Sequence, residues 1–157
     1  MFVKQLLDED FVNYKKPSMF IGFPKCSWKC EKECGEQVCQ NSTLATAKNI
    51  DIDVDKLVDR YINNPITSAI VMGGLEPLDT WEDLFELVTC IRTKTDDDIV
   101  IYTGYYKEEI QSYINELQQF KNIIIKFGRF IPNNKKHFDE VLGIHLVSDN
   151  QHAEKIS

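Results

Sequence analysis

The sequence lacks any apolar run close to the roughly 20 residues that a helix needs to span a bilayer. Nothing at its N-terminus has the pattern of a secretory signal or another targeting segment. Basic residues are also scarce, because 18 Lys and Arg stand against 25 Asp and Glu, which gives a net charge of -7. A sequence-independent grip on nucleic acid needs a positive surface. We therefore expect a cytoplasmic protein that binds neither membrane nor nucleic acid.

The composition that is present is typical of an ordinary globular protein. Hydrophobic residues make up 43% of the 157 residues and charged residues 27%. This length predicts a single domain, residues 1–157, that can bury a core of its own. A framework of disulfides is therefore not expected, although the chain has five cysteines.

Four of those cysteines lie close together, directly after the apolar run 19–23 and Pro24: they are Cys26, Cys30, Cys34 and Cys39. Thiolates spaced this closely can all bind one metal centre if the backbone bends around it, and Gly35 supplies a flexible point. The apolar run is typical of a buried strand. The cysteines then leave the end of a strand, where open α/β folds place their cofactors.

Three interpretations of the cysteine cluster compete. Structural zinc sites usually show two close pairs separated by a dozen or more residues. Here the gaps are three to four residues long and no second pair follows. A disulfide framework is disfavoured by the length of the chain and the missing secretory signal. An iron-sulfur cluster held by three thiolates, with one iron left open, is the interpretation that we favour.

The rest of the chain alternates strands with amphipathic helices. Apolar runs at 67–72, 98–103 and 123–127 each lead into glycine, and helical stripes fill the intervals between them. This alternation predicts parallel βαβ units and an α/β fold. The Gly73-Gly74 pair lets a backbone approach a ligand closely, or forms only a tight turn between a strand and a helix.

Several further segments carry expectations of their own. We expect Cys90 to be a small buried apolar residue, and 141–147 to form a last strand. Arg129 to Lys136 is expected to be an exposed loop. The run from Ser148 to Gln151 has no obvious role in stability and is a candidate contact for a partner or a cofactor.

Five motifs occur in an order that resembles a known family. They are the cysteine loop, a Gly-Gly-x-Glu-Pro turn, Tyr-Thr-Gly-Tyr, Gly-Arg-Phe and Ser-x-Asn-Gln, and the similarity as a whole covers the chain from Asp10 to Gln151. The chain is similar to the activating proteins of anaerobic ribonucleotide reductases, which are radical S-adenosylmethionine enzymes. This resemblance implies a partial (β/α) barrel of mostly parallel strands. It also implies a 4Fe-4S cluster on three cysteines.

The resemblance assigns the cluster ligands by position in the motif. Cys26 and Cys30 match the first two positions, whereas Cys34 comes one residue late for the third. Cys39-Gln40-Asn41 looks like the Cys-His-Asn that often closes the family motif. The implied ligands are therefore Cys26, Cys30 and Cys39, with Cys34 as a close rival. Leu75 interrupts the usual Gly-Gly-Glu-Pro of the family. The glycine positions of that motif are therefore assigned to Gly73 and Gly74 more safely than its glutamate position is assigned to Glu76.

By the same resemblance, S-adenosylmethionine binds the open iron through its amino and carboxylate groups. An electron from the cluster cleaves it to methionine and a 5′-deoxyadenosyl radical, and no catalytic residue is needed beyond the cluster. The implied contacts to S-adenosylmethionine are Val38, Gln40, Gly73, Gly74, Tyr102 and Thr103. The implied partners are the large subunit of an anaerobic ribonucleotide reductase, on which a glycyl radical is generated, and an electron donor such as flavodoxin.

Two alternatives remain open. The first is an iron-sulfur or zinc binding module without S-adenosylmethionine chemistry, and the second is a radical enzyme that acts on another substrate. The strands that end in glycine favour an enzyme, because an electron carrier needs no second ligand pocket. A chain this short has little material for a lid, so we expect the partner to close the site.

Overall fold

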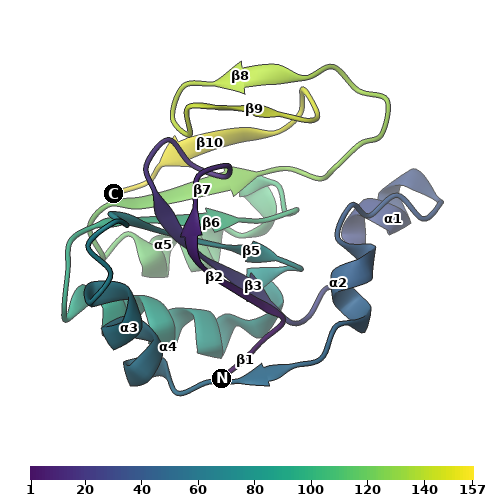
Figure 1. Ribbon diagram of the computed structural model, residues 1–157. Coiled ribbons are helices and arrows are strands. Elements are labelled where there is room, and N and C mark those ends of the chain that lie inside the picture. Colours follow the sequence, from purple (N-terminus) through teal and green to yellow (C-terminus); the bar gives the residue numbers. More distant parts are fainter.

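The computed structural model describes residues 1–157 and is organised around one six-stranded sheet (Figure 1). In chain order, its strands are Gln5–Asp10 (β2), Ser18–Phe23 (β3), Ala69–Gly74 (β5), Asp98–Tyr102 (β6), Ile123–Phe127 (β7) and His152–Lys155 (β10). Across the sheet the order is β10-β7-β6-β5-β3-β2. The four central strands pair in parallel, and the two edge strands pair antiparallel. The predicted α/β class with a mostly parallel sheet is confirmed.

The sheet is open and ends at the two edge strands β2 and β10. No closed barrel is formed. The partial barrel that the resemblance implies stays a prediction.

The two faces of the sheet are covered by different layers. Three helices, Val54–Ile62 (α3), Trp81–Arg92 (α4) and Gln111–Leu117 (α5), bury apolar stripes against one face, and the principal core of 22 buried residues lies there. The opposite face packs against a hairpin of His137–Asp139 (β8) and Ile144–Leu146 (β9), with a smaller cluster of nine buried residues. In Figure 1 this hairpin and the helical layer lie on opposite sides of the sheet. None of the helices is long and apolar enough to cross a membrane.

Short elements complete the chain. Phe2–Val3 (β1) pairs with Ile50–Asp51 (β4), and Pro77–Thr80 (η1) and Lys107–Glu109 (η2) are single turns of 3-10 helix. Two short helices, Lys29–Cys34 (α1) and Ser42–Thr46 (α2), carry the cysteine loop. They stand apart from the helical layer in Figure 1.

The end of the chain differs from the expectation. Only residues 144–146 of the expected strand 141–147 are extended, and they pair with β8 outside the main sheet. The last strand of the sheet is β10, which lies in a polar segment at the end of the sequence. Its strand signal is weak because only Ala153 among its four residues is buried.

The expectation that the 148–151 run has no structural role is wrong. Ser148 and Gln151 are buried, and the Ser148 hydroxyl donates to the carbonyl of Ile131 and accepts from its amide. The Gln151 side chain donates to the carbonyl of Gly128. The run therefore fastens the segment that follows β7.

Two single-residue expectations also change. Arg129 is buried rather than exposed, because its guanidinium is held by carboxylates. Cys90 is half-buried rather than fully buried. It packs against the core and lies 3.3 Å from a carboxylate oxygen of Asp55.

Candidate metal centre

Three of the four clustered cysteines line one cavity, which has a volume of about 310 Å³. Cys26 follows β3, Cys30 lies in α1 and Cys39 precedes α2, and all three border the cavity at the carboxyl ends of the parallel strands. Cys34 lies at the end of α1 and does not line the cavity. No cysteine forms a disulfide. The structure thus brings together the three cysteines that the resemblance assigns, and the assignment itself stays a prediction.

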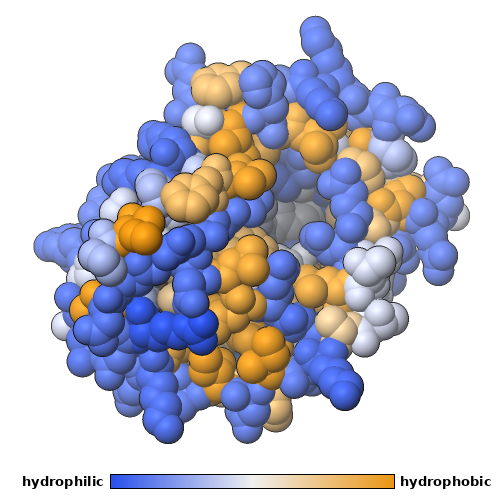
Figure 2. All heavy atoms as spheres, viewed as in Figure 1, coloured by the Kyte–Doolittle hydropathy of each residue, from blue (hydrophilic) through white to orange (hydrophobic).

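The surface is hollowed beside the cysteine helices. Figure 2 shows the hollow at the ends of the central strands, next to α1 and α2. The cavity wall includes Phe130 and residues 144–147 from the β8–β9 hairpin. The chain therefore supplies part of the cavity wall from this hairpin, and the closure of the site by a partner stays a prediction.

The cysteine loop is shaped by two left-handed residues. Trp28 precedes α1 with φ 58°, and Gly35 ends it with φ 73°. The backbone amide of Trp28 donates to Cys26 Sγ at 3.2 Å, and the Ser27 amide donates to the carboxylate of Asp79. Both contacts lie at the start of the loop, where Cys26 borders the cavity.

Burial keeps the three thiols protonated in the metal-free protein. It raises the pKa of Cys26 to about 11, and it also raises the pKa values of Cys30 and Cys39. Thiolate is the form that binds metal, so metal binding releases protons here. No group of Cys, His, Asp or Glu side chains is arranged around a point where a single ion could sit. Three thiols on one cavity wall are the donor type that an iron-sulfur cluster takes.

The predicted contacts to S-adenosylmethionine divide into two groups. Gln40, Gly74, Tyr102 and Thr103 line the cavity together with the cysteines, whereas Val38 and Gly73 do not. The carbonyl of Gly74 already accepts a hydrogen bond of 2.7 Å from the Asn41 side chain.

Gly74 is also required by the packing of the sheet. Its φ is 83°, and a Cβ there would lie 2.7 Å from the Cα of Gly22 on β3. A Cβ on Gly73 would lie 3.2 Å from the ring of Phe20. The pair thus permits close approach of β3 and β5, in addition to the place of Gly74 in the cavity wall.

Glu76 is a functional candidate that sequence reasoning set aside because of the inserted Leu75. The insertion is absorbed locally, since the Leu75 amide donates to Phe23 and the Glu76 amide donates to Lys25. The Glu76 side chain is buried in the cavity wall and accepts from the amides of Gly104 (2.8 Å) and Leu78 (3.2 Å). Burial raises its pKa to about 7.

Lys126 is a second candidate, which sequence reasoning missed. It is 7% exposed, lies in β7 and lines the cavity, and its ammonium donates to the carbonyl of Gly128 at 3.1 Å. No carboxylate forms an ion pair with it, and burial lowers its pKa to about 8. A buried lysine is rare unless it is paired. The available signal was a single lysine inside the apolar run 123–127.

Comparisons with known proteins complete the description of the site. A family model described as a 4Fe-4S single cluster domain matches residues 18–152. That range contains all the cysteines and the four parallel strands of the central sheet. Neither the curated proteins nor the solved structures yield a match. By this match over most of its length, the chain belongs to the family of 4Fe-4S single cluster domains.

Proposed function

We propose that the protein is a radical S-adenosylmethionine enzyme that generates a glycyl radical on an anaerobic ribonucleotide reductase. The cluster-binding domain is established by the family match, and the rest of the proposal builds on the cavity. One observation carries it: the cavity that holds Cys26, Cys30 and Cys39 continues past them to Tyr102, Lys126 and the hairpin. An electron carrier needs only the cysteine end of such a site.

In this proposal Cys26, Cys30 and Cys39 hold the 4Fe-4S cluster, and Cys34 does not. A bound cluster supplies an electron and one iron without a protein ligand. The cavity extends beyond the thiols, and in this proposal Gln40, Gly74, Tyr102 and Thr103 supply the wall contacts to a second ligand there. These roles agree with those that the resemblance implies.

The chain's own charged residues have distinct tasks. Lys126 offers an ammonium without a carboxylate partner, which suits an anionic group of the ligand. The Glu76 carboxylate accepts a hydrogen bond from the amide of Gly104 and so holds that residue in place. Gly104 lies beside Cys30, because a Cβ added to it would be 3.5 Å from the cysteine sulfur. The hairpin restricts the access of water to the cavity.

The partners belong to the same proposal. We infer that the reductase large subunit meets the protein at the cavity mouth and that a flavodoxin-like donor supplies the electron, in the cytoplasm. The second candidate is an electron-transfer or structural cluster module, and the family description favours it because it names a cluster and no second ligand.

The experiment that separates the two candidates is reductive cleavage. The full chain, reconstituted with iron and sulfide without oxygen, is reduced with dithionite in the presence of S-adenosylmethionine. We expect 5′-deoxyadenosine to form slowly without any partner, and a Cys30→Ala control to form none. A cluster that is loaded and reduced but yields no 5′-deoxyadenosine assigns the chain to the electron-transfer class.

A further inference from the structure

The helix α1 carries Cys30 but has no hydrophobic anchor. It is six residues long and none of its residues is buried. A helix this short is not stable by itself and is normally held by an apolar face. The contacts that fix α1 relative to the sheet are therefore mainly those of its charged side chains, and one of them places the Lys29 ammonium 4.6 Å from the centre of the Tyr105 ring.

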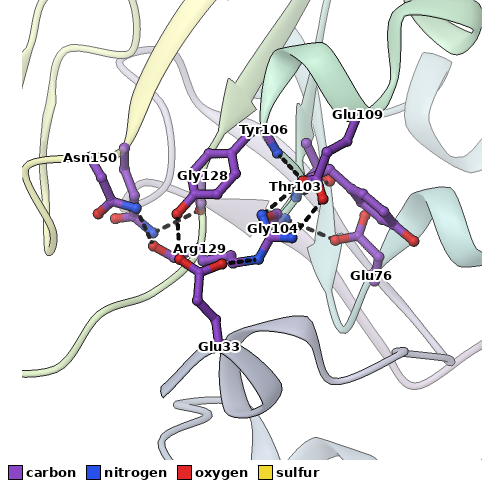
Figure 3. A network of polar contacts seen from close by, with 11 residues as sticks. Glu33, Glu76, Thr103, Gly104, Tyr106, Glu109, Gly128, Arg129 and Asn150 are labelled. Carbon is purple, nitrogen blue, oxygen red and sulfur yellow. Dashed lines mark hydrogen bonds and ion pairs between the residues drawn. The ribbon is translucent and has the colours of Figure 1, made fainter. Parts of the chain in front are cut away.

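A second polar anchor of α1 is the guanidinium of Arg129, just after β7. Its two terminal nitrogens bind both carboxylate oxygens of Glu109, at 2.8 and 2.7 Å. Its Nε lies 2.7 Å from Glu33 Oε2 on α1. One guanidinium thus bridges a carboxylate of the scaffold and a carboxylate of the cysteine helix, as Figure 3 shows.

Tyr106 closes this arrangement from one side. The Arg129 guanidinium lies 4.4 Å from the centre of the Tyr106 ring, and the Tyr106 hydroxyl donates to Glu33 Oε1 at 2.8 Å. Both oxygens of Glu33 are therefore engaged. The paired guanidinium also holds the pKa of Glu109 at about 2, so the scaffold carboxylate stays ionised at neutral pH.

The same guanidinium reaches the wall of the metal centre. Its Nη1 donates to the carbonyl of Gly104 at 3.3 Å, and Gly104 is the residue that lies against Cys30. The backbone carbonyl of Arg129 accepts a hydrogen bond of 3.0 Å from the Asn150 side chain, which also fixes the backbone of the arginine. The Arg129 side chain is only 8% exposed, so water and salt weaken its ion pairs less than they weaken an ion pair on the surface.

We propose that Glu33, Tyr106 and Arg129 form a clamp that holds α1 in place, so that Cys30 faces the cavity before the cluster enters. All three are positioning residues, since none of them lines the cavity. The inference rests on the proposed role of Cys30 as a ligand. Because the Glu33 side chain is 42% exposed, the clamp is open to screening by salt, and cluster retention depends on ionic strength.

The test measures how fast the anaerobically reconstituted protein loses its cluster to an iron chelator, followed by the cluster's visible absorbance. Glu33→Gln removes the charge of the clamp at an exposed position, and Glu36→Gln, exposed on the same loop outside the clamp, is the matched control. At low salt we expect Glu33→Gln to lose its cluster about two- to fivefold faster than the wild type, the upper part of the range for a partly exposed ion pair. Raising the salt should accelerate loss from the wild type and from Glu36→Gln, and leave Glu33→Gln unchanged.

A structural readout separates positioning from general destabilisation. Thermal unfolding of the metal-free Glu33→Gln protein should match the wild type, because α1 contributes nothing to the core. A lowered unfolding temperature together with faster loss would overturn the positioning role, and so would a loss rate equal to that of Glu36→Gln.

The two proposals fail in different ways. If Cys30→Ala retains a complete cluster, the proposed function loses a ligand and the clamp has nothing to position. If Cys30→Ala loses the cluster while Glu33→Gln behaves as the wild type does, the clamp is wrong and the ligand assignment stands.

Discussion

Cys34 and Cys39 are rivals for the third ligand position. The sequence favours Cys39 through its Cys-Gln-Asn motif, and the path of the loop agrees, because Cys39 borders the cavity and Cys34 lies at the far end of α1. Cys39→Ala should therefore abolish assembly of a complete cluster, and Cys34→Ala should leave it intact. Iron and sulfide per chain after anaerobic reconstitution measure this, and the opposite pair of results would make Cys34 the ligand.

Lys126 gives a prediction about pH. Its pKa is lowered from 10.5 to about 8, so between these values the unfolded chain binds the proton that the folded chain has lost. The contribution of Lys126 to stability therefore rises with pH across this window, by at most about 3 kcal/mol. Lys126→Met should be more stable than the wild type at pH 7, with a difference that shrinks toward pH 10. Urea unfolding of the metal-free proteins at several pH values checks this, and a difference that does not change with pH would contradict it.

At the scale of the element, the pairing of β3 with β5 depends on one glycine. Gly74→Ala would place a methyl group 2.7 Å from the backbone of Gly22, at a positive φ. Gly35 offers a matched control, since its φ is also positive but no atom lies within 4 Å of an added Cβ. Gly35→Ala should cost at most about 1 kcal/mol from its backbone conformation alone, and Gly74→Ala clearly more. Urea unfolding measures the loss of unfolding free energy in both variants. If Gly74→Ala loses no more than Gly35→Ala, a side chain at position 74 does not disturb the close approach of the two strands.

The elements found from the sequence are those with strong local signals. Runs such as 123–127 are apolar on both faces, because parallel strands are covered on both sides, and the glycines that follow them are visible as turns. β10 and the β8–β9 hairpin were missed or misplaced because they are short and half-exposed. Their pairing depends on tertiary contacts, such as that of the Ala153 amide with the Asp139 carboxylate, which no local pattern reports.

At the scale of the whole molecule, the site joins segments that are far apart in the sequence. The cysteine loop was recognisable by residue type and spacing, and Gly74, Tyr102 and Thr103 by their place at the ends of strands. Glu76 and Lys126 became apparent as candidates only when their burial was known. A charged side chain is unusual in the interior, but nothing in the neighbouring sequence marks either residue. The clamp of Glu33, Tyr106 and Arg129 links three separate segments and leaves no pattern in the sequence.

We propose that three thiolates hold a four-iron cluster whose remaining iron binds S-adenosylmethionine. Mössbauer spectroscopy of the protein reconstituted with isotopically enriched iron tests it most directly, because it distinguishes irons with different ligands. We predict one iron that differs from the other three and whose signal shifts when S-adenosylmethionine is added. Four irons with the same thiolate signature, unchanged by S-adenosylmethionine, would contradict the account and leave a fully ligated electron-transfer cluster.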